Sequence, residues 1–267
     1  MLVLVAKAVV MGIVEGLTEF LPISSTGHLI LTGAAIDYPE PQRITLEIFI
    51  QLGAILAVLW HYADDLRALA ARAPHDADAR NLVLKVLLAF VPAAVVGLLF
   101  HHAIEERLFR PEVVAATLVL GGFVILAVEY RARPMRTAAL ERLTWREAGL
   151  VGVAQVASLI PGVSRAGATI IGGLLVGLSR PVATQFSFYL ALPTVGAASI
   201  YSLLKGLPVL SAGDVAPLTV GFLAAFASAL LVIRGFLAWV QTRDLRVFGW
   251  YRIALGVLVY LVLAEHV

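Results

Sequence analysis

The stretch EGLTEFLPISSTGHL, residues 15–29, gathers glutamates, serines, threonines and a histidine within an otherwise apolar chain. Hydrophobic residues make up 60% of the 267 residues, and charged residues only 14%. A water-soluble domain of this length does not carry so much apolar surface, so the composition predicts an integral membrane protein. Polar groups embedded in such a chain are costly in lipid and therefore indicate a functional site.

Six other segments are apolar enough to cross a bilayer as helices, which takes about 20 residues each. They are residues 44–62, 82–101, 112–130, 182–204, 215–239 and 247–264. Helices are expected because an open sheet would leave backbone groups unpaired in lipid. The expected fold class is therefore an all-α integral membrane protein.

Two further apolar regions, residues 2–35 and 147–178, are each interrupted by a proline followed by small polar residues. Pro22 and Pro161 disfavour helix at the residue before them, and the serines and glycines that follow favour a new helix start. Each region thus predicts a re-entrant hairpin, in which two half-helices meet inside the membrane. Loops at that depth must be buried in protein or line a wet cavity.

An internal repeat relates the two broken regions. A shift of 140 residues aligns GIVEGLTEFLPISSTG, residues 12–27, with GVAQVASLIPGVSRAG, residues 152–167, and pairs Gly12 with Gly152 and Ser24 with Ser164. Each half then holds one hairpin and three crossings, so the second half is inverted relative to the first. We expect a single membrane domain, residues 1–267, built from inverted repeats at approximately 1–131 and 145–264.

The loop charges predict the orientation in the membrane. One predicted face carries eleven arginines: Arg67, Arg72, Arg80, Arg131, Arg133, Arg136, Arg142, Arg146, Arg180, Arg243 and Arg246. The opposite face carries five basic residues: Lys7, Arg43, Arg107, Arg110 and Lys205. By the positive-inside rule the richer face is cytoplasmic, so the first hairpin should open to the outer side.

Aromatic residues and histidines near the predicted span ends fit an interfacial position. The aromatic residues are Trp60, Tyr62, Trp145, Trp239, Trp250 and Tyr251, and the histidines are His61, His101, His102 and His266. We interpret the aromatic residues as a belt at the membrane surface, and the histidines as interfacial residues at the span ends.

Glu15 and Glu19 lie four residues apart, so on a regular helix they project from one face, one turn apart. Two carboxylates in a low-dielectric setting repel each other unless a cation lies between or beside them. The pair therefore predicts a divalent metal or a buried arginine partner. A solvated surface pair is the alternative, which the depth within an apolar segment disfavours.

The loop PISSTGHL, residues 22–29, supplies three hydroxyls and an imidazole. Ser25 and His28 can share a helix face, the geometry in which a base activates a nucleophile. Each serine taken singly is more simply a helix N-cap. A histidine beside two carboxylates in mid-membrane indicates proton chemistry.

PGVSRAGAT, residues 161–169, predicts an anion cradle, because a tight turn and a fresh helix start direct backbone N–H groups into the break. Arg165 adds a permanent cation whose planar fork fits phosphate or carboxylate oxygens. The alternative is that Arg165 only neutralises the glutamates of the other hairpin, and both roles can hold in different states.

Together these residues outline a metal-assisted phosphoryl transferase that acts on a substrate in the membrane. A transporter or flippase of prenyl phosphates is the rival, since inverted repeats with broken helices also build transporters. A purely structural scaffold leaves the mid-membrane charges unexplained. The net charge of +2 gives no sign of nucleic-acid binding.

At these residues the chain resembles the bacterial undecaprenyl-diphosphate phosphatases of the bacitracin-resistance type. EGLTEFLPISSTGH and PGVSRAGAT are similar to the two signature motifs of that family, and the likeness continues through IQLGAILAV (50–58), PAAVVGLLF (92–100) and SRPVATQFSF (179–188). The resemblance implies hydrolysis of undecaprenyl diphosphate to undecaprenyl phosphate and inorganic phosphate, which recycles the lipid carrier of peptidoglycan and other envelope polymers and confers bacitracin resistance. It also implies a bacterial inner-membrane homodimer whose site opens to the periplasm and uses Mg²⁺ or Ca²⁺.

Residue by residue, the resemblance assigns the acidic pair to Glu15 and Glu19, the serine and histidine to Ser25 and His28, and the phosphate-binding arginine to Arg165 with Ser164 and Thr169. From the two loops we add Ser24, Thr26, Gly27 and Gly162 as expected phosphate contacts. We expect the glutamates to hold the metal, and Ser25, deprotonated through His28, to attack, with His28 or a water as alternative nucleophiles. Ala166 stands where the family commonly has serine, so no hydroxyl contact is expected there.

Overall fold

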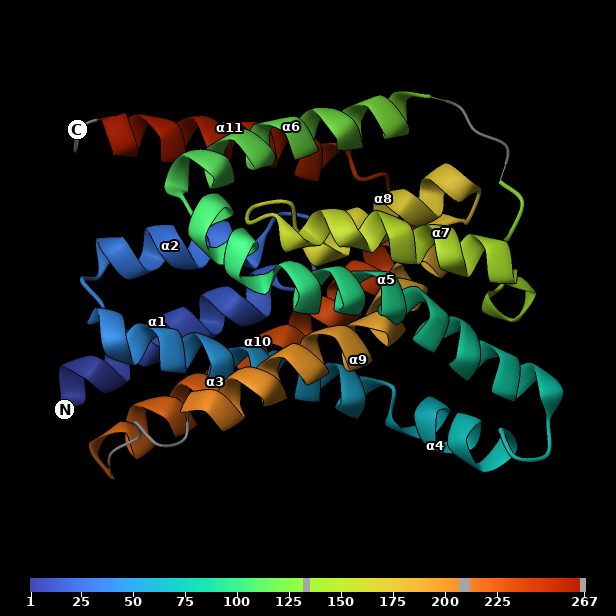
Figure 1. Cartoon of the computed structure of the whole chain (residues 1–267), viewed down its shortest axis with the longest axis horizontal. Helices are drawn as coiled ribbons and strands as arrows, with labels where there is room; N and C mark the ends of the chain where they lie inside the picture. The colour runs from blue at the N-terminus through green and yellow to red at the C-terminus, as the bar shows by residue number, and fades with distance from the viewer. Residues whose placement is uncertain (132–134, 207–211, 265–267) are drawn as a thin grey trace.

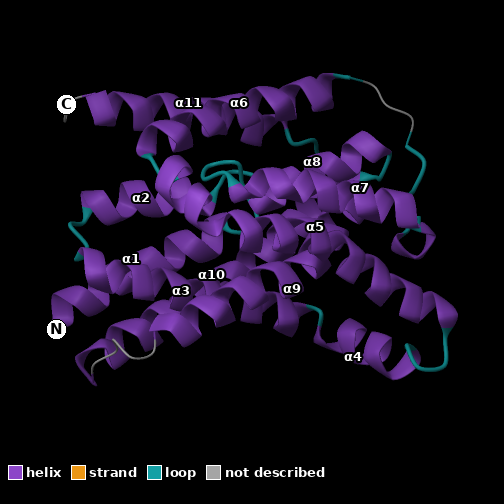
Figure 2. Ribbon diagram, in the orientation of Figure 1, coloured by secondary structure: helices purple, strands orange, loops and turns teal. Residues whose placement is uncertain are grey.

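The computed structural model describes residues 1–131, 135–206 and 212–264, in which helices are joined by loops and turns (Figure 1, Figure 2). The helices are α1 (Leu2–Thr18), α2 (Ser25–Ala35), α3 (Glu40–His61), α4 (Ala63–Arg72), α5 (Ala77–Leu108), α6 (Pro111–Tyr130), α7 (Trp145–Val156), α8 (Arg165–Val176), α9 (Arg180–Gly206), α10 (Val215–Thr242) and α11 (Arg246–Ala264). Short 3₁₀ turns are η1 (Leu140–Arg142), η2 (Ala157–Leu159) and η4 (Ala212–Asp214).

Five helices in the described part are long and apolar enough to cross a membrane: Gln42–His61, Ala77–Ile104, Pro111–Tyr130, Arg180–Leu203 and Val215–Thr242. They coincide with five of the six predicted spans. The remaining predicted span, residues 247–264, is helical as α11, which is not among these five. Large apolar side chains such as Leu98, Leu99 and Leu231 are exposed on the bundle surface, as lipid contact requires. The chain is therefore an all-helical, multi-pass membrane protein.

Glycines let the two broken regions pack tightly on long helices. α1 packs along α10, and α7 packs along α5. A Cβ atom on Gly12 would lie 2.2 Å from the carbonyl oxygen of Gly221 in α10, and one on Gly152 would lie 2.6 Å from the backbone of Ala89 in α5. Close backbone approach at small residues is how membrane helices gain packing contact. The two glycines that the repeat pairs thus serve the same purpose in α1 and α7.

Both helix breaks lie where the prolines predict them. α1 ends at Thr18 and α2 begins at Ser25. In the second region α7 ends at Val156, η2 continues to Leu159, and α8 begins at Arg165. The loop before α8 lies in the interior of the bundle (Figure 2). The residues just before the new helices, Ser24 and Ser164, both have positive φ, 70° and 71°, and both side chains accept a hydrogen bond from a backbone N–H three residues on. Their interpretation as N-caps is confirmed.

Candidate active site at the two helix breaks

The carboxylate of Glu19 joins the first break to the second. Its Oε1 accepts a hydrogen bond from Nη2 of Arg165 at 3.0 Å, and its Oε2 accepts one from the hydroxyl of Ser25 at 2.7 Å. The side chains of Glu19 and Arg165 are only 7% and 9% exposed. A charge-assisted contact in so buried a setting holds the two breaks against each other. Pairing of Arg165 with a glutamate of the other hairpin, one of the two predicted roles, is therefore present.

Arg165 also reaches α9 on its other side. Its Nη1 donates to the carbonyl oxygen of Ser187 at 3.1 Å and to the Ser187 hydroxyl at 3.3 Å, while Thr169 shares a hydrogen bond of 2.6 Å with that hydroxyl. The guanidinium carbon lies 5.7 Å from the ring centroid of Phe20. Buried Nε of Arg165 has no hydrogen-bond partner among the described residues. The guanidinium is thus held in place and keeps a donor for an incoming anion.

Ser187 has no role in the sequence-based assignment, although it lies in the SRPVATQFSF stretch that carries part of the family resemblance. Its contacts with Arg165 and Thr169 make it the group that orients the guanidinium from α9. A hydroxyl on an apolar helix has no charge to draw attention to it, so only the folded contact reveals this position.

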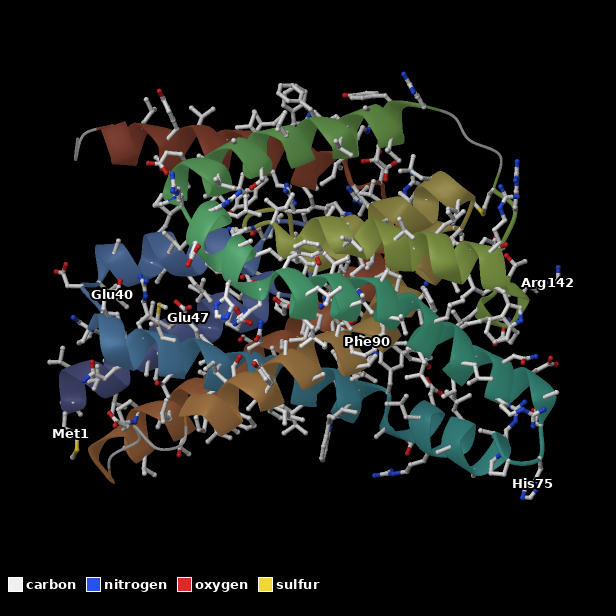
Figure 3. All side chains as sticks on the ribbon, viewed as in Figure 1. Met1, Glu40, Glu47, His75, Phe90 and Arg142 are labelled. Carbon is white, nitrogen blue, oxygen red and sulfur yellow. The ribbon has the colours of Figure 1, made fainter. Side chains whose placement is uncertain are left out.

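Glu15 lies one helical turn before Glu19 and is almost completely buried, with 1% of its surface exposed. Neither of its carboxylate oxygens has a hydrogen-bond partner in the part of the chain that the structure describes. The negative charges of Glu19 and of Glu47, which α3 contributes (Figure 3), also act on it, and the charge of Arg165 opposes them more weakly. A buried carboxylate without a donor is costly and calls for a cation or a proton.

The pair of Glu15 and Glu19 therefore fits a divalent cation. No group of three or more acidic or histidine side chains with metal-binding geometry is found among the described residues. Mg²⁺ needs no larger set, because it is commonly held by one or two carboxylates together with substrate phosphates and waters.

His28 does not contact the hydroxyl of Ser25. Its Nδ1 lies 2.7 Å from the carbonyl oxygen of Ser24, and its Nε2 lies 2.7 Å from the hydroxyl of Tyr251 in α11. The two rings are stacked, with centroids 5.6 Å apart. Because a carbonyl only accepts, Nδ1 carries the proton and Nε2 accepts from Tyr251. The expected Ser25–His28 pair is replaced by Ser25–Glu19, and Tyr251 pairs with His28 although we placed it in the interfacial belt.

The remaining predicted phosphate contacts mostly shape the breaks. Gly162 has φ +87°, and a Cβ atom there would lie 2.1 Å from the hydroxyl oxygen of Thr117, so only glycine fits. Ser164 caps α8 and also donates to the carbonyl oxygen of Leu21 across the junction at 3.4 Å. Gly27 is buried against α6, and Thr26 is partly buried in the first turn of α2.

Arg252 of α11 is a further residue of the junction, and it is absent from the sequence-based assignment. It is 1% exposed, and its guanidinium donates to five backbone carbonyls. They are Pro22 of the first break, Gly162 and Val163 of the second, and Thr117 and Leu118 of α6, at 2.9–3.4 Å. One guanidinium thus donates hydrogen bonds to backbone carbonyls of both breaks, which lie outside the regular helices. An arginine within the predicted span 247–264 was the available signal.

Comparison with known proteins places the same stretches in a family. The model of the family described as bacitracin resistance protein BacA matches residues 8–258. A protein of Dechloromonas aromatica named undecaprenyl-diphosphatase is 49% identical over 257 residues, which cover 96% of this chain and 94% of that protein. A protein of Chromobacterium violaceum named undecaprenyl-diphosphatase 1 is 50% identical over 253 residues, 94% of each chain.

Proposed function

This chain belongs to the bacitracin resistance protein BacA family, and from that premise we propose that it hydrolyses undecaprenyl diphosphate to undecaprenyl phosphate and inorganic phosphate. Relatives of nearly full length carry the name undecaprenyl-diphosphatase. The observation that carries the proposal is the contact of Glu19 with both Ser25 and Arg165. One carboxylate accepts hydrogen bonds from the serine hydroxyl and from the guanidinium. The activity would recycle the lipid carrier and so confer bacitracin resistance.

Arg165 binds the terminal phosphate of the substrate. Its Nη2 donates to Glu19, its Nη1 donates to Ser187, and its Nε has no partner among the described residues. A phosphate group that also accepts from the backbone N–H groups at a helix N-terminus binds a guanidinium more strongly than a single carboxylate oxygen does. Binding of substrate therefore releases Glu19 from Arg165 while Glu19 keeps its hydrogen bond to Ser25.

Ser25 is the nucleophile that this geometry favours. Glu19 takes the proton of the Ser25 hydroxyl as the oxygen attacks the terminal phosphorus. A bond forms between Ser25 Oγ and phosphorus, and the bridging P–O bond breaks, so that undecaprenyl phosphate leaves with the bridging oxygen. Water then hydrolyses the phosphoserine and releases inorganic phosphate. Glu19 replaces His28 as the base in this scheme, because it holds the Ser25 proton in the structure.

A divalent cation, Mg²⁺ or Ca²⁺, would be held by Glu15 and Glu19. The unpaired oxygens of Glu15 support this assignment. When bound, the cation would neutralise the negative charge of the diphosphate.

We further propose six crossings and two re-entrant hairpins in inverted repeats, residues 1–131 and 145–264, within the bacterial inner membrane. The matching caps Ser24 and Ser164 and the matching contacts of Gly12 and Gly152 support the repeat. The arginine bias of the loops supports a site that opens to the periplasm. Two residues counted for that bias lie outside what the structure describes: Arg133 and the side chain of Lys205. The predicted interfacial residue His266 also lies outside the described residues. A homodimer follows from the family resemblance alone.

The test is release of inorganic phosphate from undecaprenyl diphosphate by the purified protein in detergent, with and without a chelator. We expect release that stops on chelation and resumes with Mg²⁺ or Ca²⁺. Glu19→Gln should lower release by roughly 10²–10⁴-fold, whereas Glu40→Gln, a change at an exposed carboxylate of α3, should leave it intact. Failure of the parent protein to release phosphate under any metal condition would contradict the proposal and favour the rival, a prenyl phosphate transporter.

A further inference from the structure

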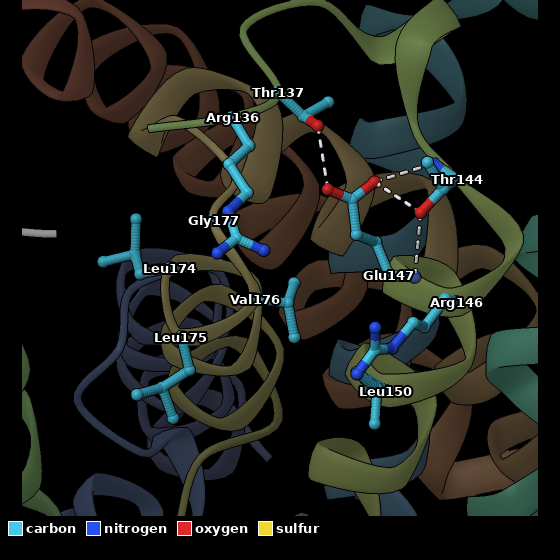
Figure 4. A pocket seen from close by; sticks show the side chains of 10 residues that line it. All are labelled: Arg136, Thr137, Thr144, Arg146, Glu147, Leu150, Leu174, Leu175, Val176 and Gly177. Carbon is cyan, nitrogen blue, oxygen red and sulfur yellow. Dashed lines mark hydrogen bonds between the residues drawn. The ribbon is translucent and has the colours of Figure 1, made fainter. Parts of the chain in front are cut away.

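A cavity of about 710 Å³ opens where α7 begins and α8 ends. Figure 4 shows its lining, which combines the loop before η1 with the first turns of α7 and the last turn of α8. Polar and apolar groups are divided within it. Arg136 and Arg146 supply charge, and Leu150, Leu174 and Leu175 supply an apolar wall.

This cavity is separate from the junction of the two breaks. Arg165 stands at the start of α8 and Val176, which lines the cavity, at its end. Eleven residues of α-helix correspond to roughly 16 Å, so the cavity cannot share a ligand's phosphate with Arg165. No step of the proposed reaction uses it.

The guanidinium groups of the two cavity arginines have no close partner in the described part of the chain. Figure 4 shows both guanidinium groups turned toward the space around Val176. Neither guanidinium makes an ion pair or a hydrogen bond with another described residue, although the charge of Arg136 acts on Glu147 at longer range. Two unpaired guanidinium groups around one cavity attract a phosphate group, which accepts from both.

Glu147 is the acidic residue of the lining, and its oxygens are already engaged. Oε1 accepts from the hydroxyl of Thr137 at 2.8 Å, and Oε2 accepts from the backbone N–H and the hydroxyl of Thr144 at 2.7 and 2.8 Å. The bonds to Thr144 belong to the capping box of α7, and together with Thr137 they occupy both carboxylate oxygens (Figure 4). Glu147 offsets part of the Arg136 charge at longer range, so the lining, with two arginines and one carboxylate, keeps a net positive charge.

The apolar wall and the neighbouring residue indicate that the anion belongs to a lipid. Leu150 and Leu175 are more than 40% exposed, which suits contact with hydrocarbon. Trp145, half-exposed at the start of α7, is of the residue type that marks the depth of lipid headgroups. Basic pockets between membrane helices are known to hold anionic lipid headgroups.

We propose that this cavity binds an anionic phospholipid, with the phosphate between Arg136 and Arg146 and the start of an acyl chain along the leucines. The bound lipid would fasten the loop at Arg136 to the end of α8, where Arg136 and Thr137 already donate backbone hydrogen bonds to Gly177. Binding should therefore raise the thermal midpoint of unfolding as lipid concentration rises.

The experiment compares phosphatidylglycerol with phosphatidylcholine of the same chain length, added to the purified full chain in neutral detergent. Retained lipid is counted by native mass spectrometry, and the thermal midpoint is followed in parallel. The double variant Arg136→Gln/Arg146→Gln removes the two positive charges of the cavity lining. Arg67→Gln/Arg142→Gln is the matched control, because these exposed arginines belong to the same loop-charge set and do not line the cavity (Arg142 is labelled in Figure 3).

We expect one phosphatidylglycerol to bind at least tenfold more tightly than phosphatidylcholine, the cavity variant to lose that preference, and the control variant to keep it. Equal losses in the two variants would show a general charge effect and overturn the proposal. Competition by glycerol 3-phosphate as strong as that of the lipid would also overturn it, since the apolar wall would then play no part. Lipid binding is measured without any phosphatase assay, so the outcome is independent of the proposed activity.

Discussion

Glu19 at the end of α1 and Arg165 at the start of α8 form a buried ion pair at 3.0 Å, although 146 residues separate them in the chain. Each residue stands at a helix break, so the contact joins the two breaks into one site. The serine hydroxyl that completes the site is bound to the other oxygen of the same carboxylate. The chemistry therefore depends on how two distant segments are brought together.

Ser25→Ala should lower the rate of phosphate release by roughly 10³-fold or more, because the attacking oxygen is lost. The substitution should leave the fold unchanged, since Ser24, not Ser25, caps α2. Quenching the parent protein during turnover and mapping phosphate by mass spectrometry should find the label on Ser25. A label on His28 would replace Ser25 as nucleophile, and no label on either residue would eliminate the covalent step.

Glu15→Gln should raise the concentration of Mg²⁺ needed for half-maximal activity by at least about tenfold, because a metal ligand loses its charge. It should also increase thermal stability without metal, since the unpaired buried carboxylate becomes neutral. The measurement is a metal titration of phosphate release, with Glu112→Gln at the exposed start of α6 as the control. An unchanged metal requirement would remove Glu15 from the proposed metal site.

Arg252→Lys should destabilise the protein, because one ammonium group with three donors cannot serve five carbonyls spread over both breaks and α6. Loss of charged hydrogen bonds costs about 2 kcal/mol, which lowers the thermal midpoint by about 4 °C or more. Arg246→Lys on the same helix is the control, since Arg246 is exposed and pairs locally with Asp244. Equal midpoints for the two variants would show that the carbonyl contacts do not hold the junction.

Gly12→Ala and Gly152→Ala should each destabilise the bundle by about 1–3 kcal/mol, because the new methyl group meets the backbone of the facing helix. Gly235→Ala in α10 is the matched control, since nothing lies within 4 Å of a Cβ atom there. Thermal unfolding in detergent compares the three variants. If Gly12→Ala and Gly235→Ala unfold together, α1 does not pack on α10 as closely as described.

Local chemistry made much of the fold predictable. Proline, serine and glycine act on their immediate neighbours, so the breaks at Pro22 and Pro161 and the caps at Ser24 and Ser164 are confirmed. Apolar length predicted six spans, and five of them are helices long and apolar enough to cross a membrane. The motifs predicted the family that the comparisons confirm. The approach of Glu19 and Arg165, expected from the inverted repeat, is present as an ion pair.

Contacts between distant segments could not be predicted in the same way. Spacing alone put Ser25 and His28 on one helix face, but α2 begins at Ser25, and the ring of His28 turns back to the Ser24 carbonyl and outward to Tyr251. The partners of Arg252 are backbone carbonyls, which every residue carries, so no sequence pattern marks them. The metal, the nucleophile and the orientation in the membrane remain predictions.

The most direct test of a site built at the junction is a double-mutant cycle on phosphate release from undecaprenyl diphosphate, with Glu19→Gln, Arg165→Gln and the two combined. Residues that act as a unit give strongly non-additive losses. We expect each single variant to lose roughly 10²–10⁴-fold in kcat/KM and the double variant to lose little more than either one. Losses that multiply in the double variant, or a single variant with activity near that of the parent, would contradict the account.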